Sequence, residues 1–124
     1  MVRTIFAAAA LAAALCAGAA SAQPMPAGVG VANGALADSS GKALYTFDMD
    51  TMVGMSHCND RCATYWPPLA AGPDAKPMGD WSVITRDDGS KQWAYKTKPL
   101  YTFAKDQPGQ PGTGGSIPHW QLAH

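Results

Sequence analysis

Apolar and polar residues alternate along much of the chain with the two-residue period of β-strands. Val29, Val31 and Leu36 flank Asn33-Gly34, and an Asn-Gly pair between apolar residues is a strong signal for a tight hairpin turn. Residues 43–47 then place successive side chains on opposite faces of a further strand. The pattern predicts a β-hairpin followed by a third strand.

The second half of the chain repeats this plan. It contains, in order, a predicted strand, turn, strand, turn and strand at 81–85, 88–89, 92–95, 96–98 and 100–103. The sequence LYTF, with an aspartate three residues after the phenylalanine, occurs in both halves as Tyr45, Phe47 and Asp50 and as Tyr101, Phe103 and Asp106. A tryptophan closes each half, 22 positions after the motif leucine at Trp66 and 20 positions after it at Trp120. The same structural unit has therefore been used twice.

We expect an all-β fold with short loops, in which residues 23–124 form one small antiparallel domain of two repeats, about 27–69 and 80–123. Each repeat should contribute three or four strands and bury its hydrophobic face against its twin around a pseudo-twofold axis. The strand aromatics are expected to form the shared core, and a ligand groove between the repeats is an alternative use for them.

Three segments between the strands are less regular. Met49–Asp60 has no clear periodicity and is predicted to be an exposed loop. Thr64–Leu69 is predicted to be a short strand, and Pro67-Pro68 places it at a sheet edge because proline cannot donate to a strand ladder. Ala70–Gly79 contains proline and glycine and is predicted to be a linker.

The N-terminus has the pattern of a secretory signal peptide over residues 1–22. Arg3 precedes an apolar run, and the small residues Ala20-Ser21-Ala22 suggest cleavage after Ala22. The run is shorter than the roughly 20 apolar residues that span a bilayer, so we expect no transmembrane segment. Lipid attachment at Cys16 is not favoured, because Leu15 stands where a lipoprotein signal has a small residue. These features predict a periplasmic or secreted protein.

Charge and composition narrow the function further. The formal net charge is zero, and all nine acidic residues are aspartate. Without a basic excess, neither nucleic acid nor an anionic membrane is an expected partner. The absence of glutamate, a good helix former, agrees with a β fold.

These residues and motifs together resemble a family of bacterial secreted repeat proteins, often described as predicted lipoproteins, with a Y-x-[FWY]-x-x-D motif. The motif is matched twice, at the tyrosines, phenylalanines and aspartates named above, and Cys58, Cys62, Trp66 and Pro67-Pro68 match the family's other markers. The resemblance covers nearly the whole chain after the signal peptide. It implies the two-repeat architecture and no established biochemical activity.

Cys58 and Cys62 are the only cysteines left after signal cleavage, and an even pair in an oxidising compartment predicts a disulfide. A thiol-disulfide redox role is an alternative. Against it, the spacing is not C-x-x-C, no thioredoxin-like pattern surrounds the pair, and Arg61 is the only nearby cation that could lower a thiol pKa.

Met49, Met52 and Met55 stand three residues apart, directly before His57 and the cysteines. Thioether sulfur selects Cu(I), so these residues are a candidate copper site. The alternative is that the methionines are apolar residues that fill irregular gaps or have no partner. If the cysteines are bridged, only the methionines and His57 remain as ligands.

Asp50 and Asp106 hold equivalent positions, and we expect each carboxylate to accept backbone N–H bonds as a structural residue. No serine-protease order, phosphate loop or zinc-protease motif is present, so an enzyme is not expected. The favoured function is a non-catalytic binding or interaction protein of the cell envelope, whose partner is an envelope protein or a small ligand. Copper binding and thiol exchange are the alternatives.

Overall fold

The structure is a computed structural model that describes residues 24–124. The expected signal peptide, its cleavage site and Cys16 lie outside these residues. The elements, in chain order, are β1 (Val29–Ala32), β2 (Ala35–Asp38), β3 (Tyr45–Phe47), α2 (Arg61–Tyr65), β4 (Trp81–Thr85), β5 (Lys91–Tyr95), β6 (Lys98–Pro99), the 3-10 helix η1 (Gly114–Ser116) and β7 (Trp120–Leu122). Almost all regular structure is therefore β, as the sequence predicts.

Two of the predicted hairpins form with the expected turns. β1 pairs with β2 across Asn33-Gly34, where both residues have positive φ, 53° and 78°, as a type I′ turn requires. β4 pairs with β5, and the Asp88 carboxylate accepts hydrogen bonds from the backbone N–H and hydroxyl of Ser90 in the connecting turn. These side-chain bonds lower the pKa of Asp88.

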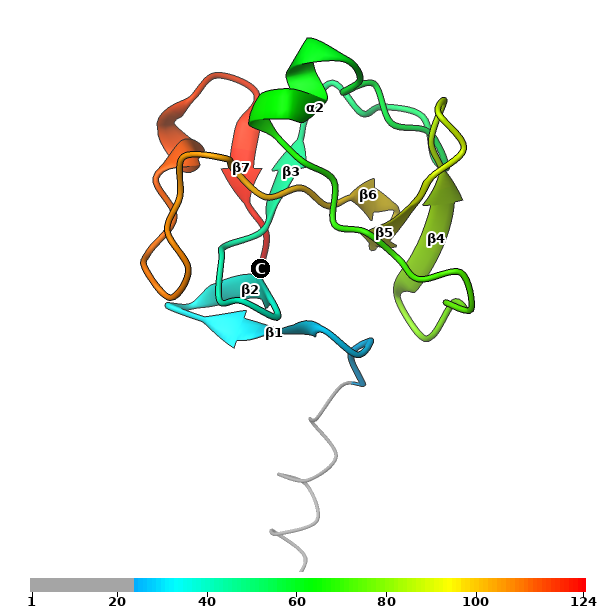
Figure 1. The fold of residues 1–124 in the computed structure, drawn as a ribbon, viewed down its shortest axis with the longest axis horizontal. Coiled ribbons are helices and arrows are strands. Elements are labelled where there is room, and N and C mark those ends of the chain that lie inside the picture. Colours follow the sequence, from blue (N-terminus) through cyan, green and yellow to red (C-terminus); the bar gives the residue numbers. More distant parts are fainter. Residues whose placement is uncertain (1–23) are drawn as a thin grey trace, which may run out of the picture.

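The closing strands are exchanged between the two halves of the chain. β7, at the end of the second half, pairs antiparallel with β3 of the first half, and the two run side by side in Figure 1. Pro68, at the end of the first half, bridges Tyr101 of the second. At the centre, Tyr45 and Tyr101 donate their N–H groups to each other's carbonyl oxygens at 2.8 and 3.0 Å. The predicted small antiparallel two-repeat fold is confirmed, and the two halves interlock, because each half is completed by strands or bridges from the other.

The predicted strand at Thr64–Leu69 is wrong. Helix α2 occupies Arg61–Tyr65, and only Pro68 and the residues around it are extended and paired. The disulfide accounts for the tight chain path that leads into the helix, because it holds the Cα atoms of Cys58 and Cys62 5.1 Å apart, whereas an extended chain would separate them by about 13 Å.

The segment predicted as a strand at 100–103 is extended but has several partners. β6 precedes it at Lys98–Pro99 and pairs with β5, while Tyr101 bridges Tyr45 and Pro68 separately. The loop predicted at Met49–Asp60 contains no strand or helix.

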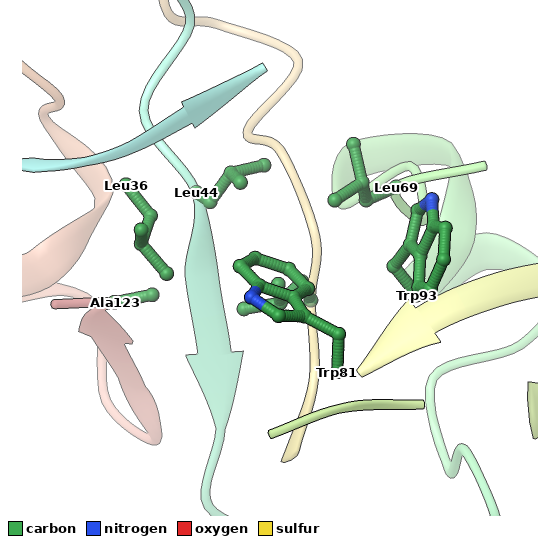
Figure 2. Close-up of a cluster of buried hydrophobic side chains, with 7 residues drawn as sticks. Leu36, Leu44, Leu69, Trp81, Trp93 and Ala123 are labelled. Atoms are coloured by element: carbon green, nitrogen blue, oxygen red, sulfur yellow. The ribbon is translucent and has the colours of Figure 1, made fainter. Parts of the chain in front are cut away.

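The buried apolar residues form two clusters. The first lies between the β1–β2 hairpin and the β4–β5–β6 sheet and contains Leu36, Leu44, Leu69, Trp81, Trp93, Leu100 and Ala123. Figure 2 shows Trp81 at its centre, with Leu36, Leu44 and Ala123 on one side and Leu69 and Trp93 on the other. The second cluster contains Ala43, Tyr45, Cys58, Trp66, Tyr101, Phe103 and Trp120. Within residues 24–124, no helix has the length and apolar character needed to cross a membrane.

Candidate functional site

The tyrosines and aspartates of the repeated motif bond across the two repeats. The hydroxyl of Tyr45 donates to Asp106 Oδ2, and the hydroxyl of Tyr101 donates to Asp50 Oδ2, each at 2.6 Å. All four side chains are buried. Burial and the bonded carboxylates raise the pKa of both tyrosines, that of Tyr45 to about 12. Both hydroxyls therefore remain protonated donors at neutral pH.

The second oxygen of each aspartate fastens the loop that follows the motif. Asp50 Oδ1 accepts the backbone N–H of His57 at 2.7 Å, and Asp106 Oδ1 accepts that of Thr113 at 2.9 Å, seven residues later in both cases. The expectation that these carboxylates accept backbone N–H groups is confirmed. The donors lie at the far end of each loop, and the tyrosine partner from the other repeat was not predicted.

Four aromatic rings stack in a row between the repeats, in the order Phe47, Trp120, Trp66 and Phe103. The two indoles are parallel within 2°, with centroids 3.8 Å apart. Each outer phenylalanine stacks on a tryptophan of the other repeat, at 4.3 Å for Phe47 and 4.4 Å for Phe103. The row has the pseudo-twofold symmetry of the repeats, and we call these residues the ring stack.

Tyr45 and Tyr101 each pack against one tryptophan of the ring stack. Tyr45 meets Trp66 edge to face at 5.2 Å, and Tyr101 meets Trp120 in the same way at 5.1 Å. Because each tyrosine is also bonded to an aspartate, the motif connects the ring stack to the two loops. Tyrosine, aspartate and ring stack form one symmetric unit.

An open groove of about 450 Å³ lies along the ring stack. We call it the aromatic groove. Its lining residues are Phe47, Arg61, Cys62, Tyr65, Trp66, Phe103, Lys105, Ile117 and Trp120. The volume falls in the range of about 300–1,000 Å³ that is usual for small-molecule sites. The groove lies where the sequence placed an alternative ligand site, between the repeats.

The structure contains the predicted disulfide between Cys58 and Cys62. Cys58 is fully buried in the second cluster, and Cys62 is partly buried in the wall of the aromatic groove. The buried guanidinium of Arg86 holds the same loop, donating to the Cys58 carbonyl at 2.6 Å and to Ser56 Oγ at 3.0 Å. The bridge thus lies in a part of the loop that is held by buried hydrogen bonds.

The family described as a secreted repeat of unknown function matches twice, at residues 30–70 and 82–122. The chain belongs to this secreted repeat family. No curated protein and no solved structure matches the chain significantly. The recognised resemblance is therefore confirmed, and the family description supports secretion without naming a ligand.

The two copies of the secreted repeat differ in the loop after the motif aspartate. Eight residues after Asp50 stands Cys58, and eight residues after Asp106 stands Gly114. A Cβ atom on Gly114 would lie 2.6 Å from Cη2 of Trp66. A side chain at this position of the second copy would therefore press on the ring stack, while the first copy carries the half-cystine at the equivalent position.

The methionine loop of the first repeat is exposed, as the sequence predicted. Met49, Met52 and Met55 have exposed fractions of 51%, 55% and 43%. The His57 side chain is 42% exposed, with Nδ1 3.7 Å from Asp50 Oδ1. Among residues 24–124, no group of three or more His, Cys, Asp or Glu side chains is arranged to hold a metal. A site here would depend on thioether sulfur and His57.

Several residues of the secreted repeat site were not singled out from the sequence. Tyr65, Lys105 and Ile117 line the groove because α2 and the loop before β7 bring them there, and Arg86 reaches the cysteine loop from the β4–β5 turn. No local pattern marks these positions. The sequence did show that Cys58 and Gly114 are equally spaced from their motif aspartates, which indicates that these two loop positions correspond.

Proposed function

We propose that the protein is a secreted, non-catalytic binding module of the bacterial cell envelope, and that the aromatic groove is its binding site. The observation that carries the proposal is the position of the groove along the ring stack, at the pseudo-twofold axis. Apolar concave sites with a few polar groups at the rim are the usual form of a ligand site.

The rigidity of the groove supports this role. Its floor is made of rings that are at least partly buried, and the tyrosines beneath them are bonded to buried aspartates. A preformed site loses little conformational entropy when it binds a ligand. Tyr65 is 49% exposed in the wall of the groove, so it is free to contact a bound molecule.

Calorimetric titration with 2-naphthylmethanol, a neutral aromatic probe, tests the proposal. Tyr65→Ala should weaken binding up to about tenfold, because an aromatic pair contributes about 0.5–1.5 kcal/mol. Val31→Ala is the matched control, since Val31 is an apolar residue in β1 that is 64% exposed and outside the groove. Equal affinity in the two variants, or failure of both this probe and its charged analogues to bind the wild type, would contradict the proposal.

Copper binding by the methionine loop is the second candidate, and the exposure of all three methionines favours it. Buried methionines would be explained by packing, but these three are about half exposed. The disulfide leaves the methionines and His57 as the soft or borderline ligands of the loop. The site would hold Cu(I).

Cu(I) titration of the oxidised protein separates this candidate from simple surface exposure. The triple variant Met49→Leu, Met52→Leu, Met55→Leu should lose affinity, while replacement of Met25 and Met78, both 36% exposed and outside the loop, should not. Equal affinity in the triple variant and the wild type would remove the copper candidate. Thiol exchange, the remaining alternative, requires a readily reducible bridge and is removed if the bridge resists a reductant of thioredoxin strength.

A further inference from the structure

We infer that the aromatic groove takes a small, planar ligand that carries an anionic group, such as an aromatic carboxylate or sulfonate. This inference rests on the proposed function and adds the chemical class of the ligand. It follows from the polar groups around the groove, whose charged members are all cationic.

The first observation is the way the ring stack meets the groove. Each tryptophan has a ring on both faces: Trp66 lies between Trp120 and Phe103, and Trp120 lies between Trp66 and Phe47. Only the edges of the two indoles can therefore reach the groove. Aromatic edges are the positive part of the ring quadrupole. The floor consequently favours electron-rich atoms of a ligand.

The second observation is the charge of the rim. Arg61 and Lys105 line the groove and are exposed, and no lining residue is acidic. Neither cation forms an ion pair with a carboxylate among residues 24–124. The groove therefore has a local charge of +2 in a chain whose formal net charge is zero. A ligand anion would meet cations that no protein carboxylate neutralises.

The third observation is the state of the two indole N–H groups. Trp66 and Trp120 are each 5% exposed and line the groove, and their Nε1–H groups form no hydrogen bond with another residue of the described part of the chain. Buried tryptophan N–H groups usually find a partner. A ligand oxygen that reaches either N–H group would supply an acceptor.

The extent of the charge limits the class of ligand. Two cations beside a groove of about 450 Å³ match one small anion with an apolar body. A nucleic acid would require a longer basic surface. The observations therefore favour a small amphiphilic molecule.

Three naphthalene probes of similar shape test the inference by calorimetry: 2-naphthalenesulfonate, neutral 2-naphthylmethanol and cationic (2-naphthylmethyl)trimethylammonium. We expect the sulfonate to bind about five- to tenfold more tightly than the alcohol, and the cation to bind most weakly, because partly exposed charge pairs contribute up to about 1 kcal/mol each. Added salt should reduce the affinity for the sulfonate and leave that for the alcohol unchanged.

Charge-removing variants identify the residues responsible. Arg61→Gln and Lys105→Gln should each weaken sulfonate binding about three- to fivefold and should weaken binding of the alcohol by a smaller factor. Lys98→Gln, an exposed lysine of β6 outside the groove, is the matched control and should behave as the wild type. Equal binding of all three probes to the wild type would overturn the inference and leave the proposed function standing. Failure of every probe to bind would overturn both.

Discussion

The loops that follow the two motif aspartates share the same hydrogen bonds at their ends but differ in the residues between them. In each, the aspartate accepts a tyrosine hydroxyl from the other repeat and the backbone N–H seven residues later. In the second loop, Thr113 adds a hydroxyl bond to the same aspartate and Gly114 lies against the ring stack. The hydrogen bonds that each aspartate makes are therefore independent of the residues inside the loop.

The first loop has additional fastenings that the second lacks. It carries the disulfide, and Arg86 donates to Ser56, Cys58 and Asn59. A bond to the tyrosine hydroxyl, by contrast, is present in both loops: Ser56 Oγ bonds Tyr101 at 2.6 Å, and the Gly114 N–H donates to Tyr45 at 3.0 Å. The comparison shows that the symmetric motif builds the fold, while the elaborated first loop adds Cys62 and α2 to one wall of the aromatic groove.

Breaking the ring stack should have the largest effect and should affect both repeats alike. Trp66→Ala and Trp120→Ala should each lower the free energy of unfolding by about 3–5 kcal/mol, because each removes a buried indole from the core. Urea denaturation followed by circular dichroism measures both. The two indoles hold equivalent places in the ring stack, so the two losses of unfolding free energy should be similar. A difference of more than about 1.5 kcal/mol, the upper contribution of one aromatic pair, would contradict the symmetry.

The exchanged tyrosine–aspartate bonds can be tested separately. Tyr45→Phe and Tyr101→Phe should each cost about 2–3 kcal/mol, because a buried carboxylate oxygen loses its donor. The two losses should be similar, because each hydroxyl has a second partner, Ser56 Oγ for Tyr101 and the Gly114 N–H for Tyr45. Denaturation of the two variants at neutral pH gives the comparison, and a cost below about 0.5 kcal/mol for both would show that the bonds do not stabilise the fold.

The pH dependence of the Tyr45 bond follows from the raised pKa. Its stabilisation is complete below the ordinary pKa of 10 and is lost as the pH rises through the folded-state value of about 12. The difference in unfolding free energy between wild type and Tyr45→Phe should therefore narrow between pH 10 and pH 12. A constant difference over this interval would contradict the raised pKa.

The glycine of the second loop should be less sensitive than the tyrosines. Gly114→Ala would bring a Cβ 2.6 Å from Trp66 Cη2, and overpacking of this kind costs about 1–3 kcal/mol. The neighbouring Gly115→Ala is the matched control, because the nearest atom there, Leu122 Cγ, is 3.8 Å away. Thermal unfolding of both variants should separate them, and equal midpoints would remove the steric explanation.

The disulfide should have the smallest effect on stability. The ring between Cys58 and Cys62 is short, with a sequence separation of four, so its closure contributes about 2 kcal/mol or less. Denaturation of the oxidised and reduced proteins measures this contribution. A loss well above 3 kcal/mol on reduction would show that the bridge does more than shape the loop.

The hairpins and the repeat were predictable because they depend on local signals. Asn33-Gly34 and Asp88-Gly89 fix their turns, and alternation fixes the faces of the strands. The exchange of closing strands was not predictable, because the repeat LYTF specifies which residues pair but not which copy supplies the partner. Helix α2 was not predicted, because the two prolines that follow it suggested an edge strand. The sequence also does not show how the disulfide bends the chain that leads into the helix.

The site was only partly predictable for a related reason. The motif residues and Trp66 were found from their spacing, because the repeat shows them twice. Arg61 and Lys105 become neighbours of one groove only when the two repeats interlock, and nothing in their local sequence distinguishes them from other surface cations. The repeat in the sequence reveals the motif residues, whereas the groove forms only when the chain folds and brings distant residues together.

The most direct measurement is the set of indole N–H signals in a ¹H–¹⁵N spectrum of the protein during titration with 2-naphthalenesulfonate. The four tryptophans divide into two in the ring stack, Trp66 and Trp120, and two in the other buried cluster, Trp81 and Trp93. Binding in the aromatic groove should shift the signals of Trp66 and Trp120 together and leave those of Trp81 and Trp93 in place. Shifts confined to Trp81 and Trp93, or no shifts at all, would contradict the assignment of the groove as the binding site.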